Sequence, residues 1–182
     1  MSTADSDAVA VVLDYLPHGR ADDDRPQYQK PPLAYALGVA DFRLYECTLA
    51  EDADVSIGDR IDLEGEAVER VKDVDHDRMS GGARSELQYA VEAIVDEDES
   101  RFVDHYNEAQ PITLRLHQLN LLPGIGKKLR NTILEERKRK PFESFDDLDD
   151  RVSGLHDPKQ VLIERIMEEL SEEDLKYRSF AV

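Results

Sequence analysis

Residues 121–130 read Leu-Leu-Pro-Gly-Ile-Gly-Lys-Lys-Leu-Arg, and this stretch decides the fold of the C-terminal half. Gly124 and Gly126 flank one apolar residue, so the chain can turn tightly with positive φ and expose its backbone N–H groups. A helix that starts directly after such a turn has an N-terminus that favours an anion. The stretch therefore predicts a helix-hairpin-helix module, whose hairpin contacts a sugar-phosphate backbone without reading bases.

Helices are expected on both sides of this hairpin. Residues 111–119 open with a proline and carry one apolar stripe, which is typical of a short helix. Residues 125–140 have apolar side chains at four-residue spacing and end in a basic run before Pro141. The alternative is a glycine-containing loop between two ordinary helices, with the lysines as solvated surface.

A degraded copy of the unit lies thirty residues downstream. Gly154 corresponds to Gly124, but His156 stands in place of Gly126, and Asp157-Pro158 replaces the lysine pair. An aspartate at this position would repel phosphate, and it is better suited to capping the next helix. The second hairpin is therefore predicted to be architectural, and the first to bind.

The predicted binding mode is capture of a phosphate by backbone N–H groups, with basic side chains around it. The basic run at residues 137–140 has two equally weighted explanations. One is phosphate binding, and the other is the ordinary preference of cations for a helix C-terminus. No catalytic residue, metal ligand or cofactor site is predicted. The expected nucleic-acid contacts are Gly124, Ile125, Gly126, Lys127, Lys128, Arg130, Arg115 and Lys138.

The net charge of −18 has the wrong sign for a nucleic-acid binder, but its distribution is uneven. Residues 1–110 hold 10 Lys and Arg against 27 Asp and Glu, whereas residues 115–140 hold 8 against 2. The basic island coincides with the hairpin and the helix after it, as expected of an electrostatic footprint.

The acidity of the remaining chain indicates adaptation to molar intracellular salt, with 23 Asp, 18 Glu and only 8 Lys. Counter-ion release contributes little affinity at such salt, so hydrogen bonds from the glycine N–H groups should matter more than the lysine charges. The alternative is that the acidic surface mimics nucleic acid or recruits a basic partner.

Period-two hydrophobicity predicts five short strands in the N-terminal part, at residues 8–16, 33–39, 42–49, 60–63 and 66–74. This number of strands in so short a segment, with no helices between them, favours a small OB-like β-barrel. From Gly81 onward, the apolar residues recur with the spacing of a helix. The predicted class is α+β, with a disordered N-terminus at 1–7, the barrel at 8–80, connecting helices at 81–110, a helix-hairpin-helix domain at 111–172 and a C-terminal strand or tail at 173–182.

The whole chain resembles the archaeal domain-of-unknown-function family 655. The residues that carry this resemblance lie in five stretches, at 11–17, 109–113, 122–128, 140–145 and 154–158. The resemblance implies an OB-like domain followed by a helix-hairpin-helix domain, in a protein that binds nucleic acid. It also favours RNA over DNA as the ligand, which the residues themselves do not decide. The high content of acidic residues in the predicted barrel is the clearest departure from the pattern of the family.

Enzymatic functions find little support in the sequence. The five histidines are far apart, none pairs with cysteine at zinc-ligand spacing, and no Walker loop or nucleophile elbow occurs. A single cysteine and the lack of a long apolar run suggest a cytoplasmic location without a membrane span. The alternative function is a non-catalytic protein-interaction adaptor in a transcription, translation or ribosome-related complex; a cryptic nuclease or glycosylase is a further rival.

Overall fold

The computed structural model describes residues 8–182, and the disordered start expected at residues 1–7 lies outside this part. The chain divides into two compact units. The first extends to Ala90 and includes Leu170–Glu173 and Phe180–Val182. The second consists of Val91–Glu169 and Asp174–Ser179, so the division falls inside a helix, α2 (Gly81–Glu97).

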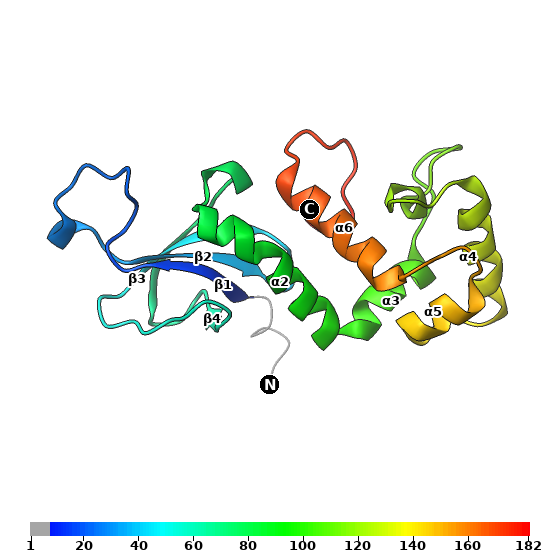
Figure 1. Cartoon of the computed structure of the whole chain (residues 1–182), viewed down its shortest axis with the longest axis horizontal. Coiled ribbons are helices and arrows are strands. Elements are labelled where there is room, and N and C mark those ends of the chain that lie inside the picture. Colours follow the sequence, from blue (N-terminus) through cyan, green and yellow to red (C-terminus); the bar gives the residue numbers. More distant parts are fainter. Residues whose placement is uncertain (1–7) are drawn as a thin grey trace. The chain divides into compact units, whose positions relative to one another are not determined.

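The first unit is a five-stranded antiparallel sheet that curls into a half-barrel (Figure 1). Its strand order is β4-β1-β2-β3-β5, and β4 and β5 are the two edges of the sheet in the described residues. All five predicted strands and the α+β class are confirmed. The strands are β1 (Val9–Leu16), β2 (Leu33–Gly38), β3 (Leu44–Leu49), β4 (Arg60–Asp62) and β5 (Val68–Asp73), with 3-10 turns η1 (Gln27–Gln29) and η2 (His76–Arg78).

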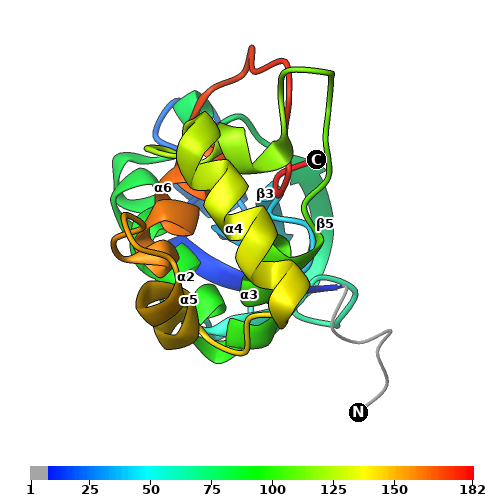
Figure 2. The same ribbon diagram turned by 90° about the vertical axis from the view of Figure 1, so that its right-hand side faces the viewer.

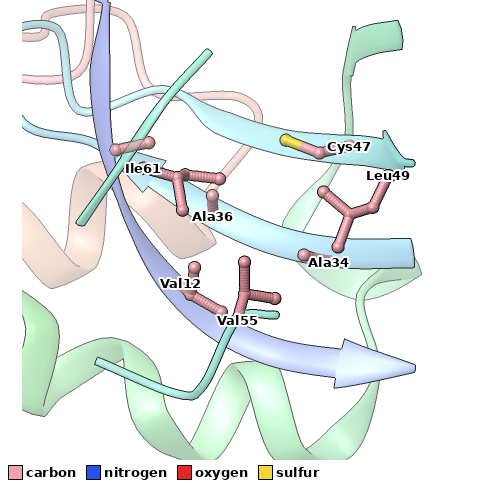
Figure 3. Packing of buried hydrophobic residues seen from close by; sticks show 8 residues of the cluster. Val12, Ala34, Ala36, Cys47, Leu49, Val55 and Ile61 are labelled. Carbon is pink, nitrogen blue, oxygen red and sulfur yellow. The ribbon is translucent and has the colours of Figure 1, made fainter. Parts of the chain in front are cut away.

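The hydrophobic core of the sheet contains unusually small side chains. Ala34 and Ala36 on β2 lie between Val12 on β1 and Cys47 on β3, and all four are fully buried (Figure 3). Small residues suit the inner face of a strongly curled sheet, where neighbouring strands crowd one another. The small side chains on this face of β2 thus accommodate the curl.

A β-bulge near Asp14 ties β1 to the start of α2. The register between β1 and β2 shifts between Val12 and Asp14. The Asp14 carboxylate accepts a hydrogen bond of 2.6 Å from the Ser80 hydroxyl, and this hydroxyl oxygen accepts the N–H of Ala83 at 3.1 Å. Ser80 therefore caps the first turn of the helix.

The second unit is helical, and α3 (Glu99–Glu108) supports α4 (Lys127–Arg139) and α6 (Pro158–Ser171) within it (Figure 2). The Tyr106 hydroxyl donates to the carbonyl of Pro158, the first residue of α6, at 2.7 Å. The Arg137 guanidinium on α4 donates to the carbonyls of Tyr106 and Ala109 at 3.1 and 2.9 Å. The remaining elements are η3 (Gln118–Leu121) and α5 (Phe145–Arg151).

The helix predicted from Pro111 is wrong. Residues 111–117 form a loop closed by a bridge between Pro111 and His117, and only the short 3-10 turn η3 comes after it. The reason is local, because the Thr113 hydroxyl oxygen accepts the N–H groups of Arg115 and Leu116 at 3.2 and 3.0 Å. Such side-chain acceptors compete with the helical hydrogen bonds.

Of the two C-terminal alternatives, a strand or a tail, the strand is wrong. Residues 172–182 contain no strand and form an irregular tail. In the second unit, the buried Arg165 and Glu169 on α6 hold this tail: Arg165 donates to the carbonyl of Tyr177 at 2.7 Å, and the Glu169 carboxylate accepts the N–H of Ser179 at 3.0 Å.

Candidate nucleic-acid interface

The first hairpin is a tight turn anchored by two buried side chains. The N–H of Ile125 donates to the carbonyl of Leu122 at 3.3 Å, and Gly124 at the third position has φ +80°. A turn of this kind requires positive φ there, which glycine adopts without strain. Leu122 and Ile125 are both buried, so Ile125, predicted as a ligand contact, holds the hairpin in place, and its N–H is used within the turn.

The N-terminus of α4 is not capped by a side chain. Gly126 is its N-cap residue, with extended backbone, and no side chain accepts a hydrogen bond from the first turn. The N–H groups of the first helical residues have no partner within a helix. A Cβ atom built on Gly124 or on Gly126 would meet no atom within 4 Å. The backbone around both glycines is therefore open, next to the positive end of the helix dipole.

Basic side chains border the pocket beside this helix end. The pocket has a volume of about 370 Å³ and is lined by Leu114, Arg115, Asn120, Lys127 and Arg130. Three of these five residues are cations and none is acidic, which contrasts with the rest of this acidic chain. The structure thus brings Arg115 close to Lys127 and Arg130, which lie twelve and fifteen residues later in the sequence.

Asn120 fixes the geometry of the pocket. Its side-chain oxygen accepts the N–H of His117 at 3.1 Å and a hydrogen bond from the Arg130 guanidinium at 3.0 Å, while its amide donates to the carbonyl of Ile125 at 3.2 Å. Asn120 therefore connects η3, the hairpin and α4. Sequence reasoning missed it, because His117 and Asn120 form a capping box with residues other than the usual Ser or Thr and Glu or Gln.

His117 takes part in the same network in its neutral form. Its Nδ1 accepts the N–H of Leu119 at 3.0 Å, and this acceptor is lost on protonation. Burial, together with the nearby Arg137 and Arg130 guanidinium groups, lowers the pKa of His117. The environment of the ring thus keeps the start of η3 intact at neutral pH.

The basic run at the end of α4 is largely structural. Arg137 caps α3, Arg139 pairs with Glu136 at 3.0 Å, and Lys140 pairs with Glu143 at 3.3 Å. Lys138 is exposed, but it lies eleven residues from Lys127, or about 16 Å along the helix axis. The structure therefore does not bring Lys138 to the pocket. Lys128 is exposed in the first turn of α4.

The second hairpin repeats the turn but not the open helix end. The N–H of Leu155 donates to the carbonyl of Val152 at 3.2 Å, both side chains are buried, and Gly154 has φ +94°. The Asp157 carboxylate then accepts the N–H of Gln160 at 3.2 Å. The first turn of α6 thus carries an anion that belongs to the protein itself.

Metal-binding clusters and membrane-spanning helices are both absent from residues 8–182. No group of three or more His, Cys, Asp or Glu side chains in this part of the chain is arranged to hold a metal ion. None of its helices combines the length and the apolar character needed to cross a membrane.

A family model described as "Protein of unknown function (DUF655)" matches residues 6–182. The chain belongs to the DUF655 family. A DUF655 protein of known structure, Af1531 from Archaeoglobus fulgidus, is 37% identical with a TM-score of 0.86, over 96% of this chain and 99% of that one. The uncharacterized protein MJ0038 of Methanocaldococcus jannaschii is 38% identical over 168 residues, which cover 90% of this chain and 74% of the relative. These likenesses establish the family and its archaeal members.

Proposed function

We propose that this DUF655 protein binds nucleic acid without catalysing a reaction, and that the N-terminus of α4 receives a backbone phosphate. RNA is the favoured ligand, on the resemblance to the family, and DNA is the alternative. One observation carries the proposal: an uncapped helix N-terminus opens beside a pocket lined by Arg115, Lys127 and Arg130. Helix N-termini with free N–H donors are anion sites, and basic side chains increase the affinity for phosphate.

In the proposed complex, the phosphate oxygens accept hydrogen bonds from Gly124, Gly126 and the first turn of α4. Lys127 and Arg130 flank the phosphate, and Arg115 approaches from the loop. Lys128 and Lys138, both exposed on α4, extend the positive surface toward neighbouring phosphates. A line of cations suits a polymer better than a small anion.

The fixed donors are well suited to the high-salt setting that the composition suggests. At molar salt the Debye length is about 3 Å, so the attraction between exposed charges is short-ranged. Hydrogen bonds from backbone N–H groups depend on geometry and are screened less. The Asn120 contact also holds the Arg130 guanidinium in one orientation, which reduces the ordering cost on binding.

The proposal extends to the architecture of both units. We infer that η3, the first hairpin and α4 form one helix-hairpin-helix element with a very short first helix, and that α5, the second hairpin and α6 form its architectural partner. We also infer that the half-barrel is an OB-like unit, since a five-stranded sheet left open between β4 and β5 fits a partly open Greek-key barrel. A cytoplasmic location is part of the same proposal.

The test is binding of labelled single- and double-stranded RNA and DNA to the wild type and to Gly126→Asp, at several KCl concentrations. Aspartate at an N-cap stabilises a helix by a few tenths of a kcal/mol relative to glycine, so the variant should fold at least as well. Its carboxylate would occupy the phosphate position. We expect affinity to fall more than about 100-fold, because like charges in contact cost several kcal/mol.

Gly126→Ala is the matched control. The backbone at Gly126 is extended and open to solvent, so an alanine side chain fits there. Unlike aspartate, alanine brings no negative charge and no hydrogen-bond acceptor to the N–H groups of the helix end. Its affinity should stay within about threefold of the wild type. Equal binding by Gly126→Asp would remove the hairpin from the interface. A folded wild type that binds none of the four ligands would favour the protein-interaction adaptor, and cleaved or abasic strands would indicate an enzyme.

A further inference from the structure

Leu114 is a fully exposed apolar side chain at the rim of the basic pocket. Its relative exposure is 107%, the highest among the exposed large apolar residues in the described chain. It also lines the pocket together with Arg115, Lys127 and Arg130. A single exposed leucine is common on protein surfaces. Leu114 is notable because it lies among the cations of a pocket that contains no acidic residue.

The loop that carries Leu114 is held by hydrogen bonds at both ends and across its tip. The N–H groups of Ile112 and Thr113 donate to the carbonyl of Leu116 at 2.8 and 2.9 Å. At its base, the N–H of Gln118 donates to the carbonyl of Gln110 at 3.0 Å, and the Gln118 side chain accepts the N–H of Gln110 at 2.8 Å. Leu114 is thus presented on a closed loop, so contact with a ligand would cost little ordering.

We propose that Leu114 packs against the face of an unpaired base next to the phosphate held at α4, so that the site selects nucleic acid with unpaired bases. This inference rests on the proposed function and specifies its ligand. The cations and N–H groups suit a polyanion, whereas Leu114 requires an apolar surface within a few ångströms of the phosphate. A nucleotide offers both, because every base has an apolar face close to its own phosphate.

Unpaired bases are favoured over a continuous duplex by the size of the site. An apolar wedge enters a duplex only when protein contacts repay the unstacking of a base step. Here a single leucine and three pocket cations are available, which is few contacts for that purpose. A base in a single strand, loop or bulge is already unstacked or easily becomes so, and its contact with Leu114 then adds directly to phosphate binding.

The test compares Leu114→Ala with Ile57→Ala, an exposed apolar control outside the pocket. Affinities are measured for a single-stranded oligonucleotide and for a duplex of the same sequence, and 2-aminopurine in the single strand reports base stacking. We expect Leu114→Ala to weaken single-strand binding roughly fivefold or more while changing duplex binding less than about twofold. The 2-aminopurine response should decrease in the same variant, and Ile57→Ala should match the wild type.

The fold should not respond to this change, because the Leu114 side chain is fully exposed, and an unchanged melting midpoint verifies this. An unchanged single-strand to duplex ratio in Leu114→Ala, with wild-type binding intact and Gly126→Asp inactive, would overturn the inference and leave the proposed function standing. A wild type that binds no nucleic acid would overturn both.

Discussion

The two hairpins of the helical unit share one turn and differ in the helix end that the turn leads into. In both, a glycine at positive φ lies between two buried apolar residues, and the same backbone hydrogen bond closes the turn. The first hairpin leads into a helix end without a side-chain cap, and the second, thirty residues later, into a helix capped by Asp157. The turn is therefore common to both hairpins, and the proposed anion site depends on the residues just after it.

The difference also changes which residues count as functional. Ile125 and Leu155 occupy the same place in the two hairpins, and both are buried. A role common to the hairpin that we propose to bind phosphate and to the one with an acidic cap is a structural role. By its thirty-residue spacing Asp157 corresponds to Lys127, but as the residue directly before its helix it takes the place of Gly126, so the contrast between the hairpins concentrates at the helix end.

The equivalence of the two hairpins in folding is tested most strongly at the buried residues Ile125 and Leu155. Ile125→Ala and Leu155→Ala should each lower the free energy of unfolding by about 2–5 kcal/mol, because each removes a buried side chain from the core. Chemical denaturation followed by circular dichroism measures both. A large loss for one and almost none for the other would show that the hairpins are not equivalent in folding.

The stability of the helical unit that contains both hairpins should decrease at acidic pH. Burial of His105 on α3 lowers its pKa to about 4, from an ordinary value of 6.5. The unfolded chain takes up this proton first as the pH falls, so the stability contribution is complete above about pH 6.5 and is lost between pH 6.5 and 4. The loss amounts to about 3 kcal/mol for a shift of this size.

The measurement is the free energy of unfolding as a function of pH for the wild type and for His105→Gln, which stays neutral. The variant should show a flatter profile between pH 6.5 and 4. An unchanged slope in His105→Gln would assign the acid sensitivity to other groups.

Backbone strain gives the smallest effect and the sharpest contrast within the first hairpin. Gly124→Ala and Gly154→Ala place a Cβ at positive φ and should each cost about 1–2 kcal/mol. Gly126→Ala lies in extended backbone and should cost less than about 1 kcal/mol. Thermal denaturation of the three variants checks this order, and an equal loss at all three glycines would contradict it.

The strands were predictable because their signal is local. Alternation of apolar and polar residues placed all five, within two residues at each end, and the helical period after Gly81 was equally plain. The hairpin glycines were also readable from the sequence, since a turn of this type depends on a few adjacent residues.

The loop at 111–117 was not predictable from periodicity, because one hydroxyl, that of Thr113, redirects the backbone away from a helix. Arg115 and Arg130 were both expected at the site, but the role of Asn120, which binds His117 at the end of that loop as well as Arg130, could not be foreseen from periodicity. The basic run at 137–140 looked equally suited to binding and to capping, and only the carbonyls that Arg137 contacts separate the two roles.

The open space at Gly126 has a consequence at the level of the gene. Two of the four glycine codons differ from an aspartate codon by a single nucleotide, so one point mutation from either would give the first hairpin an acidic cap like that of the second. The change would stabilise the helix and remove the proposed site in the same step. A preference for stability alone would therefore not keep glycine at position 126.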